Sequence, residues 1–316
     1  MLICYPGTQY DPKKETIHVD FVDFGFLDKV NNFFVNLLSR KYNVIISDKP
    51  DLLFYSDTGG SQLHRLYTCK KIFWTGESTL PDFSEADAAL TPLYLDDERH
   101  MRLPYYVIGT ECNYNDLIKI EGEENKILDE NRTDISAVIS NIGKKAKFRT
   151  NFFHEISKRT YVASGGKSLN NVGGPIAPGG KSKFSFLSKY KFNIAFENKS
   201  IPGYATEKLI EAMWARTIPI YYGDPTINED FNNKSFININ DFSDIHEGID
   251  YILEVNKSKE LYKKYLSEPF FVGNKPNKWF EEKDYLEFID NIIKSQSTRR
   301  QKGKFWGRWK IAKRMH

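Results

Sequence analysis

Short apolar runs and longer stretches with helical spacing alternate along the chain. Short segments of strand length with apolar residues at their centres occur at 43–47, 51–55, 70–74, 136–141 and 235–239. Apolar residues recur with the spacing of an amphipathic helix at 26–42, 148–159, 244–255 and 285–295. Strands that alternate with helices are typical of a parallel α/β architecture, so we predict an α/β fold.

The length of the chain allows two domains. A chain of 316 residues gives two cores at about 100–200 residues per domain. Residues 111–134 are polar and acidic, which is typical of a connection or a surface excursion. We therefore predict a first domain over 1–130 and a second over 131–298, whose last helix packs back on the first. Residues 299–316 would form a separate basic tail.

The stretch 192–225 has the most informative pattern. FNIAFEN predicts a strand, TEKLIEAMWAR predicts a helix with one apolar face, and TIPIYYGDP predicts a second strand. In a βαβ unit the loop before the helix lies at the carboxyl edge of the sheet, where α/β folds bind ligands. A ligand is therefore expected beside this loop.

The charges at the start of this helix indicate what the ligand could be. Thr206 is the expected N-cap and Glu207 suits the positive helix end, whereas Lys208 is unfavourable there. A bound anion would remove that conflict, and Gly203 would let the backbone approach it closely. The residues alone leave two interpretations open: a phosphate-bearing ligand with a sugar or base beside it, or a structural loop with Lys208 in solvent.

The charge balance argues against a nucleic-acid binder. Residues 299–316 hold eight Lys or Arg and no acid, so the rest of the chain has 37 basic against 42 acidic residues. A mildly acidic body with a basic tail does not suit a general nucleic-acid surface. No apolar run reaches the ~18 residues of a membrane span, and the N-terminus does not have the pattern of a signal peptide. We expect a cytoplasmic protein.

Nothing in the sequence indicates a metal or another cofactor. Three widely spaced cysteines and six scattered histidines form neither a zinc motif nor a disulfide framework. The acidic run at 95–98 lacks a DxD spacing. GGKS occurs at 165–168 and at 179–182, but Tyr161 and Pro175 stand where a P-loop requires glycine.

The stretch from Phe192 to Asp224 closely resembles the signature FNxxFEN…GYxTEK…IPIYxG of the α-1,3/4-fucosyltransferases, glycosyltransferase family 10. Weaker similarity extends to FWTGES at 73–78, RLP at 102–104, SN at 140–141 and SGGKSLNNVGG at 164–174. The resemblance implies a GT-B fold, in which two Rossmann-like domains face a cleft. It also implies inverting transfer of fucose from GDP-fucose, bound by the second domain, to an acceptor bound by the first domain, an oligosaccharide that contains N-acetylglucosamine, as in Lewis-antigen synthesis.

The resemblance also assigns donor-binding residues. Lys208 and Arg149 match the family's contacts to the diphosphate, and a guanidinium suits that task because it donates two parallel hydrogen bonds. The alternative for Arg149 is a surface helix residue without a ligand. The remaining positions that match the fucose and nucleotide pocket are Glu197, Asn198, Tyr204 and Glu207, and Arg149 and Glu207 are also expected to act in catalysis.

Glu77 is the expected catalytic base. The strand KKIFW is followed by Thr-Gly-Glu, which places a carboxylate in the loop at the strand's carboxyl end, and the resemblance assigns the base role to this position. The family's usual Asn is replaced here by Ser78, which changes the expected acceptor contacts. Without the resemblance, Glu77 would be read as a solvated loop residue.

Two other functions are compatible with the sequence. One is a transferase that uses another GDP-sugar or another acceptor. The other is a protein that binds glycans or sugar nucleotides without turnover, although a binder needs no base and the chain has both Glu77 and Lys208. The sequence does not decide between 1,3 and 1,4 linkage.

The basic tail predicts peripheral binding to anionic membranes. Its aromatic residues, Phe305, Trp306 and Trp309, alternate with Lys and Arg in FWGRWKIAKRMH, a composition that suits an anionic lipid surface. Each basic residue near such a surface adds about 1 kcal/mol. A solvated tail without a partner is the alternative.

We therefore expect the full chain to sediment with anionic vesicles at low salt and to be released at high salt. A chain that ends at Ser297 should stay in solution and still modify a soluble acceptor. Equal vesicle binding by the two forms would show that the tail is not the membrane anchor.

Overall fold

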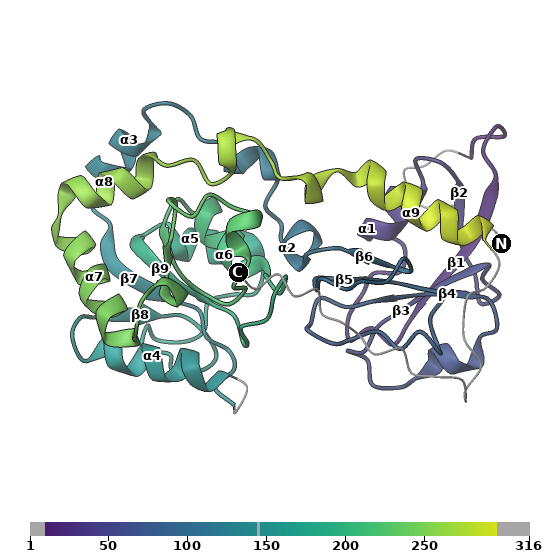
Figure 1. Cartoon of the computed structure of the whole chain (residues 1–316), viewed down its shortest axis with the longest axis horizontal. Coiled ribbons are helices and arrows are strands. Elements are labelled where there is room, and N and C mark those ends of the chain that lie inside the picture. Colours follow the sequence, from purple (N-terminus) through teal and green to yellow (C-terminus); the bar gives the residue numbers. More distant parts are fainter. Residues whose placement is uncertain (1–9, 144–145, 296–316) are drawn as a thin grey trace. The chain divides into compact units, whose positions relative to one another are not determined.

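The computed structural model describes residues 10–143 and 146–295 and divides into two compact units (Figure 1). Of the described residues, the first unit contains 10–103 and 281–295, and the second contains Pro104–Phe280. Each unit has its own parallel sheet with helices, which confirms the predicted α/β class. The predicted tail at 299–316 lies outside the described residues.

The first unit contains a six-stranded sheet in the order β2-β1-β3-β4-β5-β6, with parallel neighbours throughout. Its elements are β1 (Thr16–Val22), α1 (Phe33–Leu38), β2 (Asn43–Ile46), β3 (Leu52–Tyr55), β4 (Lys70–Trp74), β5 (Ala88–Thr91), β6 (His100–Arg102) and α9 (Glu282–Lys294). Phe54 stacks on Phe21 and Phe34, with ring centroids 5.2 and 4.5 Å apart. These rings join α1 to the neighbouring strands β1 and β3.

Helix α9 belongs to the first unit although the second unit precedes it in the sequence. The Tyr42 hydroxyl donates to Asp290 on this helix, and Lys70 Nζ donates to the carbonyl oxygens of Ile292 and Ile293, at 2.5 and 2.7 Å. These carbonyls lie in the last turn of α9, where no intrahelical N–H is available and a positive charge is favourable.

The second unit contains a five-stranded sheet in the order β11-β10-β9-β7-β8, again with all neighbours parallel. Its elements are α2 (Tyr105–Ile108), α3 (Glu123–Asp129), β7 (Thr133–Ala137), α4 (Lys147–Ser157), β8 (Val162–Ser164), α5 (Gly180–Leu187), β9 (Tyr190–Phe196), α6 (Glu207–Trp214), β10 (Ile218–Tyr222), β11 (Ile237–Asn238), α7 (Ile245–Lys257) and α8 (Lys259–Ser267).

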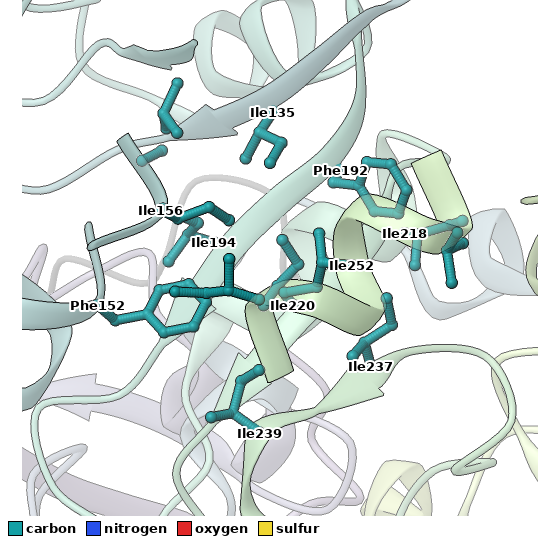
Figure 2. Close-up of a cluster of buried hydrophobic side chains, with 14 of the residues drawn as sticks. Ile135, Phe152, Ile156, Phe192, Ile194, Ile218, Ile220, Ile237, Ile239 and Ile252 are labelled. Carbon is teal, nitrogen blue, oxygen red and sulfur yellow. The ribbon is translucent and has the colours of Figure 1, made fainter. Parts of the chain in front are cut away.

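Helices cover both faces of this sheet. On one face, apolar residues of β7, β9 and β10 form a single buried cluster with α4, α7 and α8; Figure 2 shows Ile194 and Ile220 from the strands beside Phe152 from α4 and Ile252 from α7. On the other face, α6 packs against β9 and β10. Burial on both sides explains why the strands are nearly continuous apolar runs in the sequence.

The boundary between the units differs from the expected position near residue 130. Tyr106 and Leu117 are fully buried in one cluster with Leu209 and Phe231, so the polar stretch before residue 131 packs with the second unit. It includes the short helix α3, whose Ile127 is also buried. The boundary was misplaced because the many acidic residues of this stretch outnumber the few apolar residues that anchor it to the second unit.

The helix predicted over 26–42 is much shorter than expected, because only Phe33–Leu38 is helical. The Asn32 side chain accepts a hydrogen bond from Val35 N at 3.0 Å and caps the helix there. Asp28 accepts bonds from the backbone of the two residues 30 and 31, which holds the preceding segment in a turn. No helix in the two described ranges is long and apolar enough to cross a membrane.

Two isoleucines of the second unit test where its stability originates. Ile252 is fully buried, whereas Ile120 is 73% exposed. We expect Ile252→Ala to lower the free energy of unfolding by about 2–5 kcal/mol, because it leaves a cavity in a close-packed core. The matched substitution Ile120→Ala should change it by less than about 0.5 kcal/mol. Urea unfolding followed by circular dichroism measures both, and equal losses would contradict the assigned core.

Candidate active site

The loop between β9 and α6 lies at the carboxyl edge of the second sheet. Strands β9 and β10 are paired up to Phe196 and Tyr222, and Glu197 N donates to the Tyr222 carbonyl at 2.7 Å. The chain then turns at Gly203, whose φ of +84° is in the left-handed region that glycine adopts without strain. The loop therefore returns to α6 directly beside the strand ends.

The Glu197 carboxylate is the centre of this edge. Its side chain is fully buried and accepts hydrogen bonds from Thr206 N at 2.7 Å, from Thr206 Oγ1 at 2.8 Å and from Lys208 Nζ at 2.9 Å. Gly223 lies against it, and a Cβ at that position would be only 2.5 Å from Glu197 Cγ. The close approach of the backbone explains why glycine follows β10.

The start of α6 differs from the sequence-based expectation. Thr206 occupies the N-cap position, but its side chain makes no capping bond and instead bonds to Glu197. The Glu197 carboxylate thus supplies a negative charge at the helix start, where we had expected an external anion to balance Lys208. An anionic ligand remains compatible with this edge, but the helix end alone does not require one.

Lys208 is held between carboxylates. Its Nζ lies 2.9 Å from Glu197 Oε2, 2.6 Å from Thr206 Oγ1 and 3.7 Å from Glu207 Oε1. Burial alone would lower the pKa of Lys208, but Glu197 and Glu207 outweigh it and raise the pKa above the ordinary value. The side chain is 23% exposed, so the ammonium is charged, fixed and partly accessible. The interpretation with Lys208 free in solvent is wrong.

Arg149 is buried near the start of α4 rather than on the helix surface. Its Nη1 donates to the Phe196 carbonyl at 3.1 Å and its Nη2 to the Asn141 carbonyl at 2.6 Å. Within the described residues, its Nε has no hydrogen-bond partner. Burial lowers the pKa of Arg149, and the charges of Glu197 and Glu207 oppose that shift. The guanidinium therefore bonds to neutral carbonyls and keeps donors available.

Lys183 and Glu211 form a second group of charges that interacts with Glu207. Burial would raise the pKa of Glu207, but Lys208 and Lys183 lower it below the ordinary value, so this carboxylate is ionised at neutral pH. Lys183 on α5 forms an ion pair with Glu211 on α6. Burial raises the pKa of Glu211, and Lys183 opposes the rise.

The structure brings most of the predicted residues together. Arg149 interacts electrostatically with Glu197, Tyr204 and Glu207, and Lys208 bonds to Glu197. Tyr204 is buried, and Asn198, the residue after Glu197, is half-buried. All six lie in the second unit, whereas Glu77 belongs to the first.

Glu77 lies in the loop that follows β4, as predicted. Its side chain is exposed, and its backbone N donates to Thr75 Oγ1 at 3.0 Å. The same hydroxyl donates to Asp57 Oδ1 at 2.8 Å. The buried Thr75 therefore fixes the backbone of the loop, while the carboxylate of Glu77 stays accessible to a substrate. Among the described residues, no group of three His, Cys, Asp or Glu could hold a metal ion.

Sequence reasoning missed three features of this site. It did not find that Glu197 balances Lys208, that Gly223 is required by close packing, or that Lys183 pairs with Glu211. The glycine after a strand was visible in the sequence and indicates a close backbone approach. The two ion pairs join residues 11 and 28 positions apart, and no local pattern indicates such pairs.

Comparisons with known proteins connect both units to one family. The family described as "Glycosyltransferase family 10 (fucosyltransferase) C-term" matches residues 128–290, and "Alpha-(1,3)-fucosyltransferase FucT N-terminal domain" matches residues 19–109. The chain is 31% identical over 272 residues to the Helicobacter pylori protein named alpha-(1,3)-fucosyltransferase FucT. That alignment covers 75% of this chain and 56% of the relative, so the chain spans little more than half of the relative's length.

Solved structures show the same fold. A crystal structure described as alpha1,3-fucosyltransferase with GDP has a TM-score of 0.71 and 27% identity, and covers 91% of this chain and 93% of its own. Another, described as alpha1,3-fucosyltransferase with GDP-fucose, has a TM-score of 0.71 and 26% identity, and covers 93% and 95%. The predicted GT-B class, with two Rossmann-like domains, is confirmed. The chain belongs to glycosyltransferase family 10, the fucosyltransferases.

Proposed function

We propose that this protein transfers fucose from GDP-fucose to a hydroxyl of an oligosaccharide that contains N-acetylglucosamine, with α-1,3 linkage and inversion at the anomeric carbon. The observation that carries the proposal is the cationic pair Arg149 and Lys208 at the carboxyl edge of the second sheet. It is supported by the solved relatives described with GDP and with GDP-fucose.

The charge arrangement around Arg149 favours an anionic ligand. A buried charge is costly unless it is paired or fully hydrogen-bonded. The bonds of Arg149 go to the main-chain carbonyls of Phe196 and Asn141, so the positive charge receives only distant compensation from Glu197 and Glu207. A diphosphate would supply both the missing counter-charge and acceptors for the remaining N–H groups.

The proposed reaction forms one bond while another breaks. The Glu77 carboxylate takes the proton of the acceptor hydroxyl as its oxygen attacks the anomeric carbon. The bond from that carbon to the phosphate oxygen breaks on the opposite side, and GDP leaves with the bonding electrons. Arg149 and Lys208 neutralise the charge that grows on the diphosphate. The ionised Glu207 carboxylate stabilises the positive charge that develops on the sugar ring.

Two alternatives make different predictions. A transferase with another GDP-sugar or acceptor, or with 1,4 linkage, would use the same residues and give a different product. A protein that binds glycans or sugar nucleotides without turnover would keep its ligand affinity when Glu77 is lost. Incubation with GDP-fucose and a panel of galactose–N-acetylglucosamine acceptors, followed by linkage analysis of the product, distinguishes these possibilities.

The proposed mechanism makes a prediction about the catalytic base, Glu77. Glu77→Gln keeps the shape of the side chain but cannot take the proton, so turnover should fall at least ~100-fold. The affinity for GDP, measured by calorimetry, should stay the same, because the proposed donor residues lie in the second unit. Glu98→Gln changes another exposed carboxylate of the first unit and should leave turnover unchanged. Near-normal turnover of Glu77→Gln would remove Glu77 from the mechanism.

The second prediction concerns the donor anion. Arg149→Ala and Lys208→Ala should each weaken GDP binding by about 1.5–3 kcal/mol, the contribution of a charge-assisted hydrogen bond. Lys264 is exposed on α8, which packs on the sheet face opposite to α6, and Lys264→Ala should have no effect. Thermal melting of each variant shows whether it is folded. Folded variants of both residues that bind GDP as tightly as the wild type would exclude these two side chains as diphosphate ligands.

A further inference from the structure

The loop that carries Glu77 begins at a rigid point of the first sheet. Thr75 directly follows β4 and is fully buried. Its backbone N donates to the Leu90 carbonyl at 3.4 Å, which continues the pairing of β4 with β5. The preceding Trp74 ring stacks on the Phe24 ring, with centroids 5.7 Å apart. Thr75 is therefore fixed by the sheet, whereas Glu77, two residues later, is exposed.

The Thr75 hydroxyl makes two hydrogen bonds whose directions are determined. A backbone N–H can only donate, so the bond of 3.0 Å between Glu77 N and Thr75 Oγ1 makes the hydroxyl oxygen an acceptor. The hydroxyl hydrogen is then available for Asp57 Oδ1, 2.8 Å away. The bonds therefore run in one order, from the amide of Glu77 to the hydroxyl of Thr75 and on to the carboxylate of Asp57.

This order strengthens the hold on Glu77. A hydrogen bond to a carboxylate is stronger than one between neutral groups, and linked hydrogen bonds polarise one another. A hydroxyl group can otherwise rotate to suit any neighbour, and Asp57 removes that freedom from Thr75. Because Asp57 lies just after β3, the bonds also join the loop of Glu77 to the neighbouring loop.

The far end of the loop of Glu77 is tied to the same neighbour. Glu85 Oε1 accepts from Arg65 Nε at 2.8 Å, and Glu85 Oε2 lies 3.0 Å from His64 Nε2. Both partners belong to the short 3₁₀ helix Leu63–Leu66, which lies between β3 and β4. The loop is therefore held at its two ends by the segment that precedes it, and its backbone has little freedom to shift.

A general base needs this kind of restraint. It must lie within hydrogen-bond reach of the proton that it takes, and a displacement of about 1 Å can cost about 100-fold in rate. The Glu77 side chain is exposed, so packing does not fix its direction. Its amide nitrogen is joined to the carboxyl group only through the Cα, Cβ and Cγ atoms of the same residue. The bond from that nitrogen to Thr75 is therefore a fixed point close to the carboxylate.

We propose that Thr75 is a positioning residue for the transfer reaction: its hydroxyl, oriented by Asp57, fixes the backbone of Glu77 and so aims the carboxylate at the acceptor hydroxyl. This inference rests on the proposed function. In this role Thr75 touches no substrate and acts only through Glu77. Loss of the hydroxyl should therefore slow the chemical step and leave the binding of GDP-fucose unaffected.

The test removes the hydroxyl without changing the shape of the side chain. Thr75→Val replaces the hydroxyl with a methyl group, so kcat should fall at least about tenfold, because the base is no longer aimed. The KM for GDP-fucose should stay within about twofold, since the loss concerns the transition state only. Thr75→Ser keeps a hydroxyl that can accept from the same amide and should retain most of the wild-type kcat.

Thr58→Val is the matched control. Thr58 Oγ1 accepts from Gly25 N at 3.0 Å, so this hydroxyl also joins two loops of the first unit, but the bond does not involve the loop of Glu77. Its loss should leave kcat unchanged. Thermal melting shows whether each variant is folded. An equal fall in kcat for Thr58→Val and Thr75→Val would overturn the proposal, because the effect would then be common to hydroxyls that join loops.

A double-mutant cycle shows whether Thr75 acts through Glu77. Thr75→Val should change the residual turnover of Glu77→Gln by less than about twofold, because residues that act as one unit are not additive. Without the carboxylate there is no base to aim. Losses that multiply in the double variant would indicate general damage to the unit and overturn the proposal.

Failure of this inference and failure of the proposed function give different results. If the wild type makes product and folded Thr75→Val has the wild-type kcat, the role of Thr75 is overturned and the transferase stands. If the wild type makes no product, the proposed function fails and the role of Thr75 fails with it.

If Thr75→Val does not fold, amide hydrogen exchange of the wild type, followed by NMR, decides the role of Thr75. The Glu77 amide should exchange at least about tenfold more slowly than an unprotected amide, because its hydrogen bond must open first. Exchange at the unprotected rate would overturn the proposal.

Discussion

The ligand edge of the second unit depends on one buried carboxylate. The Glu197 side chain is inaccessible to solvent and accepts hydrogen bonds from Thr206 and Lys208, and removing one partner of such a buried ion pair is strongly destabilising. The same bonds fix the start of α6, orient Lys208 and require glycine at position 223. The backbone of the loop, the position of the cation and the packing of β10 are therefore consequences of one ion pair.

Lys208 is paired with Glu197, whereas, within the described residues, the hydrogen bonds of Arg149 go to carbonyl oxygens rather than to a carboxylate. Its bonds to carbonyl oxygens keep it in place but provide no negative charge. Arg149 and Lys208 are both held in place by bonds within the protein before any ligand arrives. Preorganisation of this kind is what stabilises charge that develops during a reaction, since no groups need to reorient at that moment.

The sequence predicts those strands and helices whose structure is determined by the pattern of neighbouring residues. Strands β2, β3, β4 and β9 and helices α4, α7 and α9 lie where apolar runs and periodicity indicate them. Strand β1 was missed because His18 and Asp20 interrupt its apolar residues, and Asp20 is nevertheless buried with Lys29 as its partner. Helix α8 was missed because only two of its residues, Tyr262 and Leu266, are buried. Both β1 and α8 are determined by contacts with residues that are distant in the sequence.

The same distinction holds for the candidate site. Motif spacing placed Glu77, Arg149 and the loop of Glu197 at strand ends and helix starts, where the structure has them. It did not reveal that Arg149 is buried or that Lys208 is already paired, because both depend on residues that are distant in the sequence.

The most direct test of the account is the structure of the product. NMR analysis of the wild-type reaction with GDP-fucose and N-acetyllactosamine should show fucose on the 3-hydroxyl of N-acetylglucosamine. Its anomeric configuration should be opposite to that in the donor, and one GDP should be released for each fucose transferred. Retained configuration, or release of GDP and free fucose without any glycoside, would contradict inverting transfer at this site.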